Sequence, residues 1–126
     1  MDDLGGPEAE FRAYLGQGKF MLQRSKGTGK HTFYPRVAIP GTGETDLEWV
    51  EASGRGTVYA STVNRGRDRS YNIVLVELDE GPRLLSTVEG EVAVAIGTRV
   101  QALIKQIEGE PEVIFKIEAG NRADAL

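Results

Sequence analysis

Five short segments between residues 56 and 120 are rich in β-branched and aromatic residues, and each is bounded by glycine, proline or a polar turn. Segments of this composition are typical of β-strands. In order they read GTVYASTVNRG, YNIVLVELDEG, PRLLSTVEG, RVQALIKQIEGE and EVIFKIEAG. In the last segment Val113, Phe115 and Ile117 alternate with Lys116 and Glu118, so apolar and charged side chains should lie on opposite faces. The sequence therefore predicts a mainly β fold.

The spacing of these segments indicates how the strands are arranged. The third and fourth are separated by EGEVAVAIGT, which suits a turn or a single helical turn. Five antiparallel strands with an interruption after the third have the strand count and rhythm of an OB-fold barrel. A small β-sandwich is the alternative, because periodicity does not determine topology. The near-continuous run IVLVEL suggests a central strand that is covered on both sides.

The N-terminal part is predicted to begin with a short amphipathic helix. Pro7 suits a first helical position, and Phe11, Tyr14 and Leu15 follow at helical spacing before Gly16. KFMLQR then has the composition of a short strand, and the next residues are rich in Gly, Thr and Pro, as in knuckle-like loops. We therefore divide the chain into an N-terminal segment at 1–46, an OB-fold domain at 47–120 and a flexible tail at 121–126.

Composition narrows the class of function. The chain of 126 residues has a net charge of −4 and a pI of about 5.1, so nucleic acid is not expected as a partner. The absence of cysteine excludes disulfides and thiolate chemistry. The N-terminus, MDDLGGPEAEFR, is too acidic for a signal peptide, and no apolar run approaches the roughly 18 residues of a membrane helix. We expect a cytoplasmic protein without membrane contact.

No motif supports catalysis. GTGK resembles part of a phosphate-binding loop, but Arg24 and His31 stand where that motif needs Gly and Ser or Thr. His31 is the only histidine, so a catalytic triad or a His-based metal site has no second member at a suitable spacing. Glu77, Asp79 and Glu80 could act as acid and base or bind a hard cation, but a turn with solvated charges is the plainer interpretation. No catalytic residue is predicted.

A basic loop is the main binding candidate. NRGRDRS places Arg65, Arg67 and Arg69 between the first two barrel strands, in the loop that often contacts ligands in OB-folds. Guanidinium groups suit phosphate. A solvated hairpin tip partly neutralised by Asp68 is the alternative. Nucleic-acid binding would also need exposed aromatic rings beside the loop, and the flanking tyrosines could equally belong to the core.

Two aromatic features flank the irregular segment. Trp49 lies where that segment joins the barrel, and we expect its ring to pack the two parts together while its N–H finds a hydrogen-bond acceptor. Pro35 biases Tyr34 towards an extended conformation, so Phe33 and Tyr34 should point in opposite directions. One ring could then be buried while the other faces a partner or ligand.

Several motifs together resemble an acyl-CoA-associated OB-fold family with an N-terminal zinc ribbon, known as domain of unknown function 35. They are FYPR, which is similar to the family's Phe-x-Pro-Arg between two knuckles, SGRGTVY shortly after the tryptophan, and ELDEGPRLLS. The similarity extends over residues 7–118. It implies a non-catalytic partner of thiolase-superfamily enzymes, which act on coenzyme A thioesters in complexes whose thiolase-like chain carries the reactive groups.

The sequence departs from this family in the ribbon. Where the family has Cys-x-x-Cys twice, this chain has Ser25 with Thr28 and Ile39 with Thr42. Hydroxyl groups are poor zinc ligands beside thiolates, and an isoleucine side chain cannot coordinate a metal. Zinc is therefore not expected, and the ribbon is predicted to be degenerate and metal-free.

The predicted function is a non-catalytic OB-fold accessory subunit of a thiolase, acyltransferase or aldolase, supporting complex assembly and access of the coenzyme A thioester. The expected partners are a thiolase-like catalytic subunit and its acyl-CoA substrate, with coenzyme A held at the interface. Two alternatives stay open: a single-stranded nucleic-acid-binding OB-fold protein and a stand-alone acyl-CoA-binding protein. The candidate contact residues are Phe33, Tyr34, Arg36, Trp49, Arg65, Arg67 and Arg69.

Overall fold

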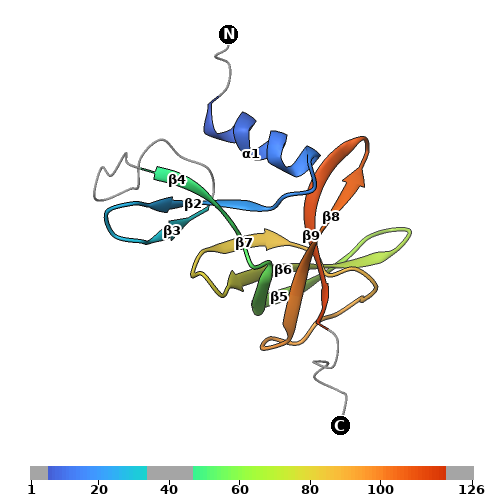
Figure 1. The fold of residues 1–126 in the computed structure, drawn as a ribbon. Coiled ribbons are helices and arrows are strands. Elements are labelled where there is room, and N and C mark those ends of the chain that lie inside the picture. The colour runs from blue at the N-terminus through green and yellow to red at the C-terminus, as the bar shows by residue number, and fades with distance from the viewer. Residues whose placement is uncertain (1–5, 34–46, 119–126) are drawn as a thin grey trace.

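The computed structural model of the chain describes residues 6–33 and 47–118 (Figure 1). These residues form a helix, a small N-terminal sheet and a larger curled sheet. In chain order the elements are α1 (Pro7–Gly16), β2 (Met21–Ser25), β3 (His31–Thr32), β4 (Leu47–Glu51), β5 (Arg55–Arg65), β6 (Ser70–Leu78), β7 (Arg83–Ser86), β8 (Arg99–Ile107) and β9 (Glu110–Ile117).

The larger sheet has five antiparallel strands in the order β7-β6-β5-β8-β9. The edges of the sheet meet where the segment directly after β7 pairs with β9: Phe115 N–H donates to Thr87 O at 3.0 Å, and Glu89 N–H donates to Phe115 O at 2.7 Å. The sheet thus curls into a nearly closed barrel, which confirms the predicted OB-fold; the β-sandwich alternative is wrong. The segment after β7 contains turns and no helix.

The barrel core is built from alternate residues of each strand. On β6 the side chains of Val74, Val76 and Leu78 are buried, while Ile73 and Leu75 on the opposite face are half-buried. The run IVLVEL is therefore a central strand paired along both edges, as predicted, but only one face is fully buried, so the predicted cover on both sides is incomplete. The fully buried large residues of the barrel include Phe115, Leu78, Val58, Val74, Val76, Val88 and Val100.

The smaller sheet has the order β3-β2-β4 (Figure 1). Its strands β2 and β3 belong to the segment predicted to be a degenerate zinc ribbon. Because β4 pairs with β2, the division between the two sheets falls after Glu51 and not after residue 46. Phe20 and Leu22 belong to the same core cluster as the barrel residues, so the two sheets share one hydrophobic core. The functional division of the chain into separate segments stays a prediction.

Helix α1 begins at Pro7 and ends at Gly16, as the sequence predicts. Its buried residue is Leu15, and Phe11 packs edge-to-face on Phe20 and Phe33 with ring centroids 6.3 and 5.3 Å apart. The helix thereby covers the junction between the small sheet and the barrel. Among the residues that the structure describes, no helix has the length and apolarity needed to span a membrane.

The acidic residues at the end of β6 and in the turn after it are partly exposed, as the interpretation as solvated charges expects, and each also pairs with a neighbouring residue of the chain. Asp79 accepts two hydrogen bonds from Arg99, at 2.8 and 2.9 Å. Glu77 pairs with Arg83 at 3.3 Å, and Glu80 accepts the Ser53 N–H at 2.6 Å. These carboxylates tie neighbouring strands and loops together, and they form no metal cluster among the described residues.

Glu118 directly follows β9, and its side chain is buried, although the alternation along the strand predicts a solvent-facing position. It pairs with Arg55, and its second carboxylate oxygen lies 3.6 Å from Arg99 Nε. A buried carboxylate needs such partners because burial disfavours an isolated charge. Arg99 therefore bridges Glu118 and Asp79 at one end of the barrel.

We expect the contribution of the Asp79–Arg99 pair to folding stability to be lost at acid pH. The hydrogen bond and charge of Arg99 lower the pKa of the Asp79 carboxyl below its ordinary value. A carboxylate with a lowered folded-state pKa stabilises the protein above its unfolded pKa of about 3.9, and this contribution is lost as pH falls through the folded value. Asp79→Asn should therefore lower stability at pH 7, by about 1 kcal/mol or less for so exposed a pair.

The measurement is the urea midpoint of the wild type and the variant at pH values from 7 to 2. The difference between them should shrink below about pH 4. Asp68→Asn is the control, because Asp68 is exposed and forms no ion pair within the described residues. A difference that stays constant over the whole pH range would contradict the linkage.

Candidate functional site

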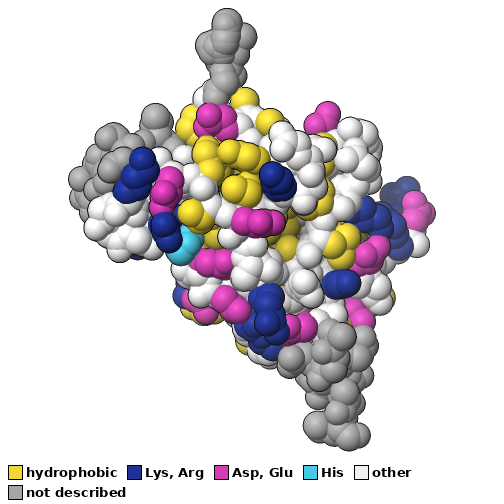
Figure 2. All heavy atoms as spheres, in the orientation of Figure 1, with side chains coloured by type: hydrophobic (Ala, Val, Ile, Leu, Met, Phe, Trp, Pro, Cys, Tyr) yellow, Lys and Arg dark blue, Asp and Glu magenta, His cyan; other side chains and the backbone are white. Residues whose placement is uncertain are grey.

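Three arginines stand at the tip of the β5–β6 hairpin. Gly66 N–H donates to Arg69 O at 2.9 Å, and a Cβ at Gly66 would lie 2.7 Å from that oxygen, so this tight turn requires glycine. The side chains of Arg65 and Arg67 are exposed, as is most of the tip. Figure 2 shows Lys and Arg side chains gathered over this hairpin at the right of the molecule.

Within the described part of the chain, these three guanidinium groups have no acidic partner. Arg65, Arg67 and Arg69 form no ion pair with any residue of the described ranges, whereas Arg55, Arg83 and Arg99 all do. Asp68, which the alternative of a partly neutralised hairpin tip requires as a counter-charge, forms no ion pair with them. The tip is thus a local concentration of positive charge on a chain whose net charge is −4. Such a cluster suits an anionic ligand.

An apolar groove lies directly beside the arginines. It has a volume of about 630 Å³ and runs from Arg69 and Tyr71 on the hairpin to Lys105 and Ile107 at the end of β8. Tyr71, Val92 and Ile107 line it with 44, 57 and 42% of their surfaces exposed. The groove lies between the tip of the β5–β6 hairpin, the loop after β7 and the end of β8, next to the two loops that flank the ligand face of OB-folds.

One buried amide holds the wall of this groove in place. Asn72 Nδ2 donates to Val88 O at 2.9 Å and to Glu91 O at 2.8 Å. Its Oδ1 accepts the Val88 N–H at 2.7 Å and the Thr87 hydroxyl at 2.9 Å. Asn72 thereby fastens the loop after β7 to β6. The sequence did not single out this residue, because it appears as one polar position at the start of an apolar run.

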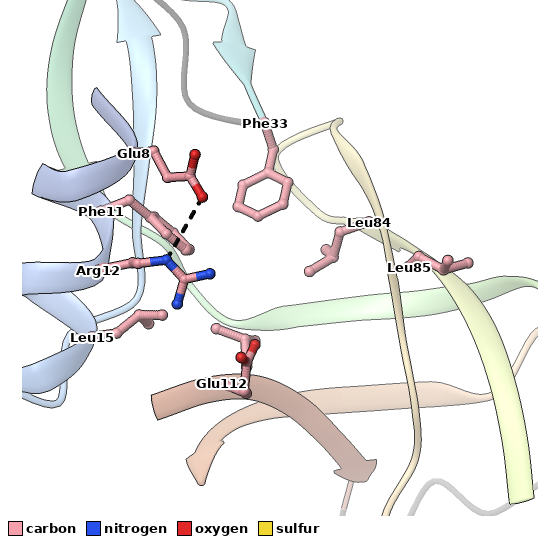
Figure 3. Close-up of a pocket in the computed structure, with 9 residues that line it drawn as sticks. Glu8, Phe11, Arg12, Leu15, Phe33, Leu84, Leu85 and Glu112 are labelled. Carbon is pink, nitrogen blue, oxygen red and sulfur yellow. Dashed lines mark ion pairs between the residues drawn. The ribbon is translucent and has the colours of Figure 1, made fainter. Parts of the chain in front are cut away.

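A second hollow lies where α1 meets both sheets (Figure 3). It has a volume of about 330 Å³, and its walls come from the helix, the end of β3, β7 and β9. Phe33, a predicted contact residue, lies in this wall beside Phe11. Sequence reasoning missed the other members, since they belong to segments far apart in the chain. Its lining residues are Glu8, Phe11, Arg12, Leu15, Phe33, Leu84, Leu85, Glu112 and Val113.

The remaining predicted contact residues lie elsewhere. Trp49 Nε1 donates to Glu10 Oε1 at 3.1 Å, and its ring lies 5.6 Å from that of Tyr14, so it joins β4 to α1. Tyr34 and Arg36 lie outside the described residues. The structure therefore does not bring the predicted contacts into one site: the arginines stand at the hairpin tip, Phe33 at the cavity and Trp49 against the helix.

The first knuckle of the ribbon uses its hydroxyl groups internally. Ser25 is fully buried, and its Oγ accepts the Thr28 N–H at 3.1 Å. Thr28 Oγ1 in turn accepts the Lys30 N–H at 3.2 Å, and Gly29 N–H donates to Ser25 O at 2.7 Å. These bonds hold the β2–β3 turn through the chain's own polar groups. The second pair, at residues 39 and 42, lies outside the described residues.

No catalytic constellation is present in residues 6–33 and 47–118. The imidazole of His31 forms no hydrogen bond or ion pair there, so no carboxylate orients it as a base. No group of three or more Asp, Glu or His side chains is placed to hold a metal within these ranges. What the described surface offers is contact: a positive tip, an apolar groove and an apolar cavity.

Comparison with known proteins agrees with the fold. Residues 49–105 match the family model of the ChsH2 C-terminal OB-fold domain. One chain of a solved structure described as an Ltp2-ChsH2(DUF35) aldolase superposes with a TM-score of 0.76 at 25% identity, over 88% of this chain and 94% of that one. These matches support the assignment of the chain to the DUF35 OB-fold family. The resemblance inferred from its motifs is confirmed.

Two further relatives extend the comparison. A crystal structure of a DUF35-family protein of unknown function from Sulfolobus solfataricus superposes with a TM-score of 0.66 at 20% identity. The superposition covers 93% of this chain and 90% of that one, so the two proteins share the fold. A probable enoyl-CoA hydratase alpha subunit from Thermomonospora curvata is 27% identical over 106 residues. The match covers 80% of this chain, which spans only 33% of that relative's length.

Proposed function

We propose that this DUF35 protein is a non-catalytic accessory subunit of an enzyme that acts on coenzyme A thioesters, and that its partner is a thiolase-superfamily catalytic subunit. The observation that carries the proposal is the set of uncompensated guanidinium groups beside an apolar groove on an acidic chain. Its relatives are described as an aldolase and as an enoyl-CoA hydratase subunit. Together these point to coenzyme A chemistry.

The geometry suits the two halves of a coenzyme A thioester. Its phosphates would pair with Arg65, Arg67 and Arg69, whose planar forks can bind phosphate oxygens in pairs. Its uncharged portion would lie along the groove lined by Tyr71 and Ile107. Because the described residues contain no acid–base or nucleophilic group arranged for catalysis, bond making and breaking would fall to the partner.

The test is the affinity of the assembled complex for an acyl-CoA, measured by isothermal titration with acetyl-CoA. Replacing the three tip arginines with glutamine should weaken binding about tenfold or more, because each charge-assisted bond is worth about 1.5 kcal/mol or more where water is excluded. Arg83→Gln is the matched control, since that guanidinium is already paired with Glu77. Unchanged affinity in the triple variant would rule out the phosphate role.

One observation favours a second function. Tyr71 is 44% exposed and lies next to Arg69, so the groove offers a ring for base stacking beside a positive charge. Binding of a fluorescent single-stranded oligonucleotide by the isolated chain, abolished in the triple arginine variant and weakened by salt, would support nucleic-acid recognition instead. Tight acetyl-CoA binding by the isolated chain would indicate a stand-alone acyl-CoA-binding protein.

A further inference from the structure

The barrel is open along part of the seam between its outer strands, β7 and β9. At one end the seam is closed by the two backbone bonds of Phe115, and Ser86 Oγ donates to Val113 O at 2.9 Å. Further along, no backbone hydrogen bond joins residues 83–85 to residues 110–112. The cavity beside α1 lies at this opening (Figure 3). The helix thus spans a gap that the sheet itself does not close.

The walls of this seam cavity are mainly apolar, and Glu8, Arg12 and Glu112 are its charged members. Phe11 and Leu15 come from α1, Phe33 from the end of β3, and Leu84 and Val113 from the two strands of the seam. Figure 3 shows Phe33 and Leu84 pointing into the hollow, while Leu85 turns away from it towards the rim. The volume is about 330 Å³, enough for an inserted side chain. Water against the apolar part of the wall would find few polar partners, so an apolar group would replace it favourably there.

The rim carries an uncompensated negative charge. Arg12 lies 3.6 Å from Glu8 one helical turn away, which balances those two charges. Glu112 on β9 is exposed and forms no ion pair with any described residue. Figure 2 shows hydrophobic side chains gathered where α1 meets the sheets, with Asp and Glu side chains around them. An apolar group that enters the cavity would therefore be best accompanied by a positive charge.

We propose that the seam cavity is where the catalytic subunit docks: one of its surface segments inserts an apolar side chain between α1 and the seam, and a neighbouring Lys or Arg pairs with Glu112. This inference rests on the proposed function. Leu85, which is 62% exposed, adds apolar contact area at the rim. A buried apolar anchor surrounded by a polar rim is the usual arrangement of an interface hot spot. The arginine tip and its groove are left free for the thioester.

The experiment measures the affinity between this chain and a thiolase-like catalytic subunit identified by co-purification with it, by titration of the two purified proteins. Leu85→Lys and Glu112→Lys each place a positive charge at the rim, and each should weaken binding about tenfold or more through lost anchoring and repulsion of the basic segment. Glu112→Asp keeps the charge and should retain most of the affinity. Ile96→Lys is the matched control, because Ile96 is 68% exposed and lies outside the cavity lining.

Circular dichroism and the urea midpoint of each variant establish that it is folded. If the wild-type pair binds and all three lysine variants bind equally well, the docking inference is overturned while the proposed function stands. If Ile96→Lys weakens binding and the rim variants do not, the interface lies elsewhere and the inference is again overturned. If the wild-type chain forms no complex with the thiolase-like protein, both the docking inference and the proposed function fail.

Discussion

Replacing Asn72 with alanine should destabilise the folded chain by about 3 kcal/mol or more. The side chain is 1% exposed and forms four hydrogen bonds to the loop after β7. Without it, the buried Val88 N–H and C=O lose this partner, and each buried group left unpaired costs about 1–3 kcal/mol. The part-buried carbonyl of Glu91 loses one hydrogen bond as well. Water entering the vacated space would recover part of this loss. The expected destabilisation is therefore smaller than the sum of the costs of the separate unpaired groups.

The measurement is the free energy of unfolding from urea titration at pH 7. Asn64→Ala is the matched control, because Asn64 is an exposed residue of the same hairpin, and it should change stability by less than about 0.5 kcal/mol. The Asn72 variant should also bind acetyl-CoA more weakly in the complex, since the loop it holds forms a wall of the groove. A loss below about 1 kcal/mol would show that the loop is held by other contacts.

Local patterns in the sequence were sufficient to predict the elements. Pro7 and Gly16 mark the ends of α1, and the glycines and prolines between apolar runs mark the turns of the barrel. Each of these signals depends on neighbours a few residues away. The alternation around Phe115 also indicated a core residue, and that side chain is fully buried.

Interactions between distant residues could not be predicted in this way. Asn72 and Glu118 are polar residues whose partners lie many residues away, so no local pattern separates them from surface positions. For the same reason, the pairing of Asp79 with Arg99 could not be predicted, because it exists only once the barrel brings β8 beside the end of β6. Buried polar residues are specified by the completed fold, whereas apolar alternation is specified by each strand alone.

The same distinction between local patterns and long-range contacts applies to the candidate site. The positive tip at Arg65 to Arg69 was predicted because one turn sequence contains all three arginines. The seam cavity was not predicted, because its walls come from four elements and exist only where β7 and β9 diverge. Phe33 was recognised as a contact candidate from its motif, but its position in the cavity wall follows from packing on Phe11.

Gly56 provides the second large expected effect, because it lies where β5 is paired on both edges. Its Cα partners are Leu78 on β6 and Val100 on β8, and the residue is buried. A Cβ here would lie 2.7 Å from Glu77 O and 2.8 Å from Val76 Cγ1. The oxygen belongs to the backbone of a core strand and cannot move without disturbing the ladder. Gly56→Ala should therefore cost about 2–4 kcal/mol.

The free energy of unfolding from urea titration also checks this prediction. Gly16→Ala is the control, since a Cβ at the end of α1 meets nothing within 4 Å, and it should leave stability unchanged or slightly raised. Gly56 is the second glycine of SGRGTVY, one of the motifs that suggested the family. If Gly56→Ala folds as stably as the wild type, close strand packing does not explain that glycine, and a direct contact with ligand or partner becomes the better explanation. A large loss of stability would instead show that the barrel requires this glycine for its folding. This part of the motif would then have a structural role, whereas the arginine tip would bind the thioester and the seam cavity would bind the catalytic subunit.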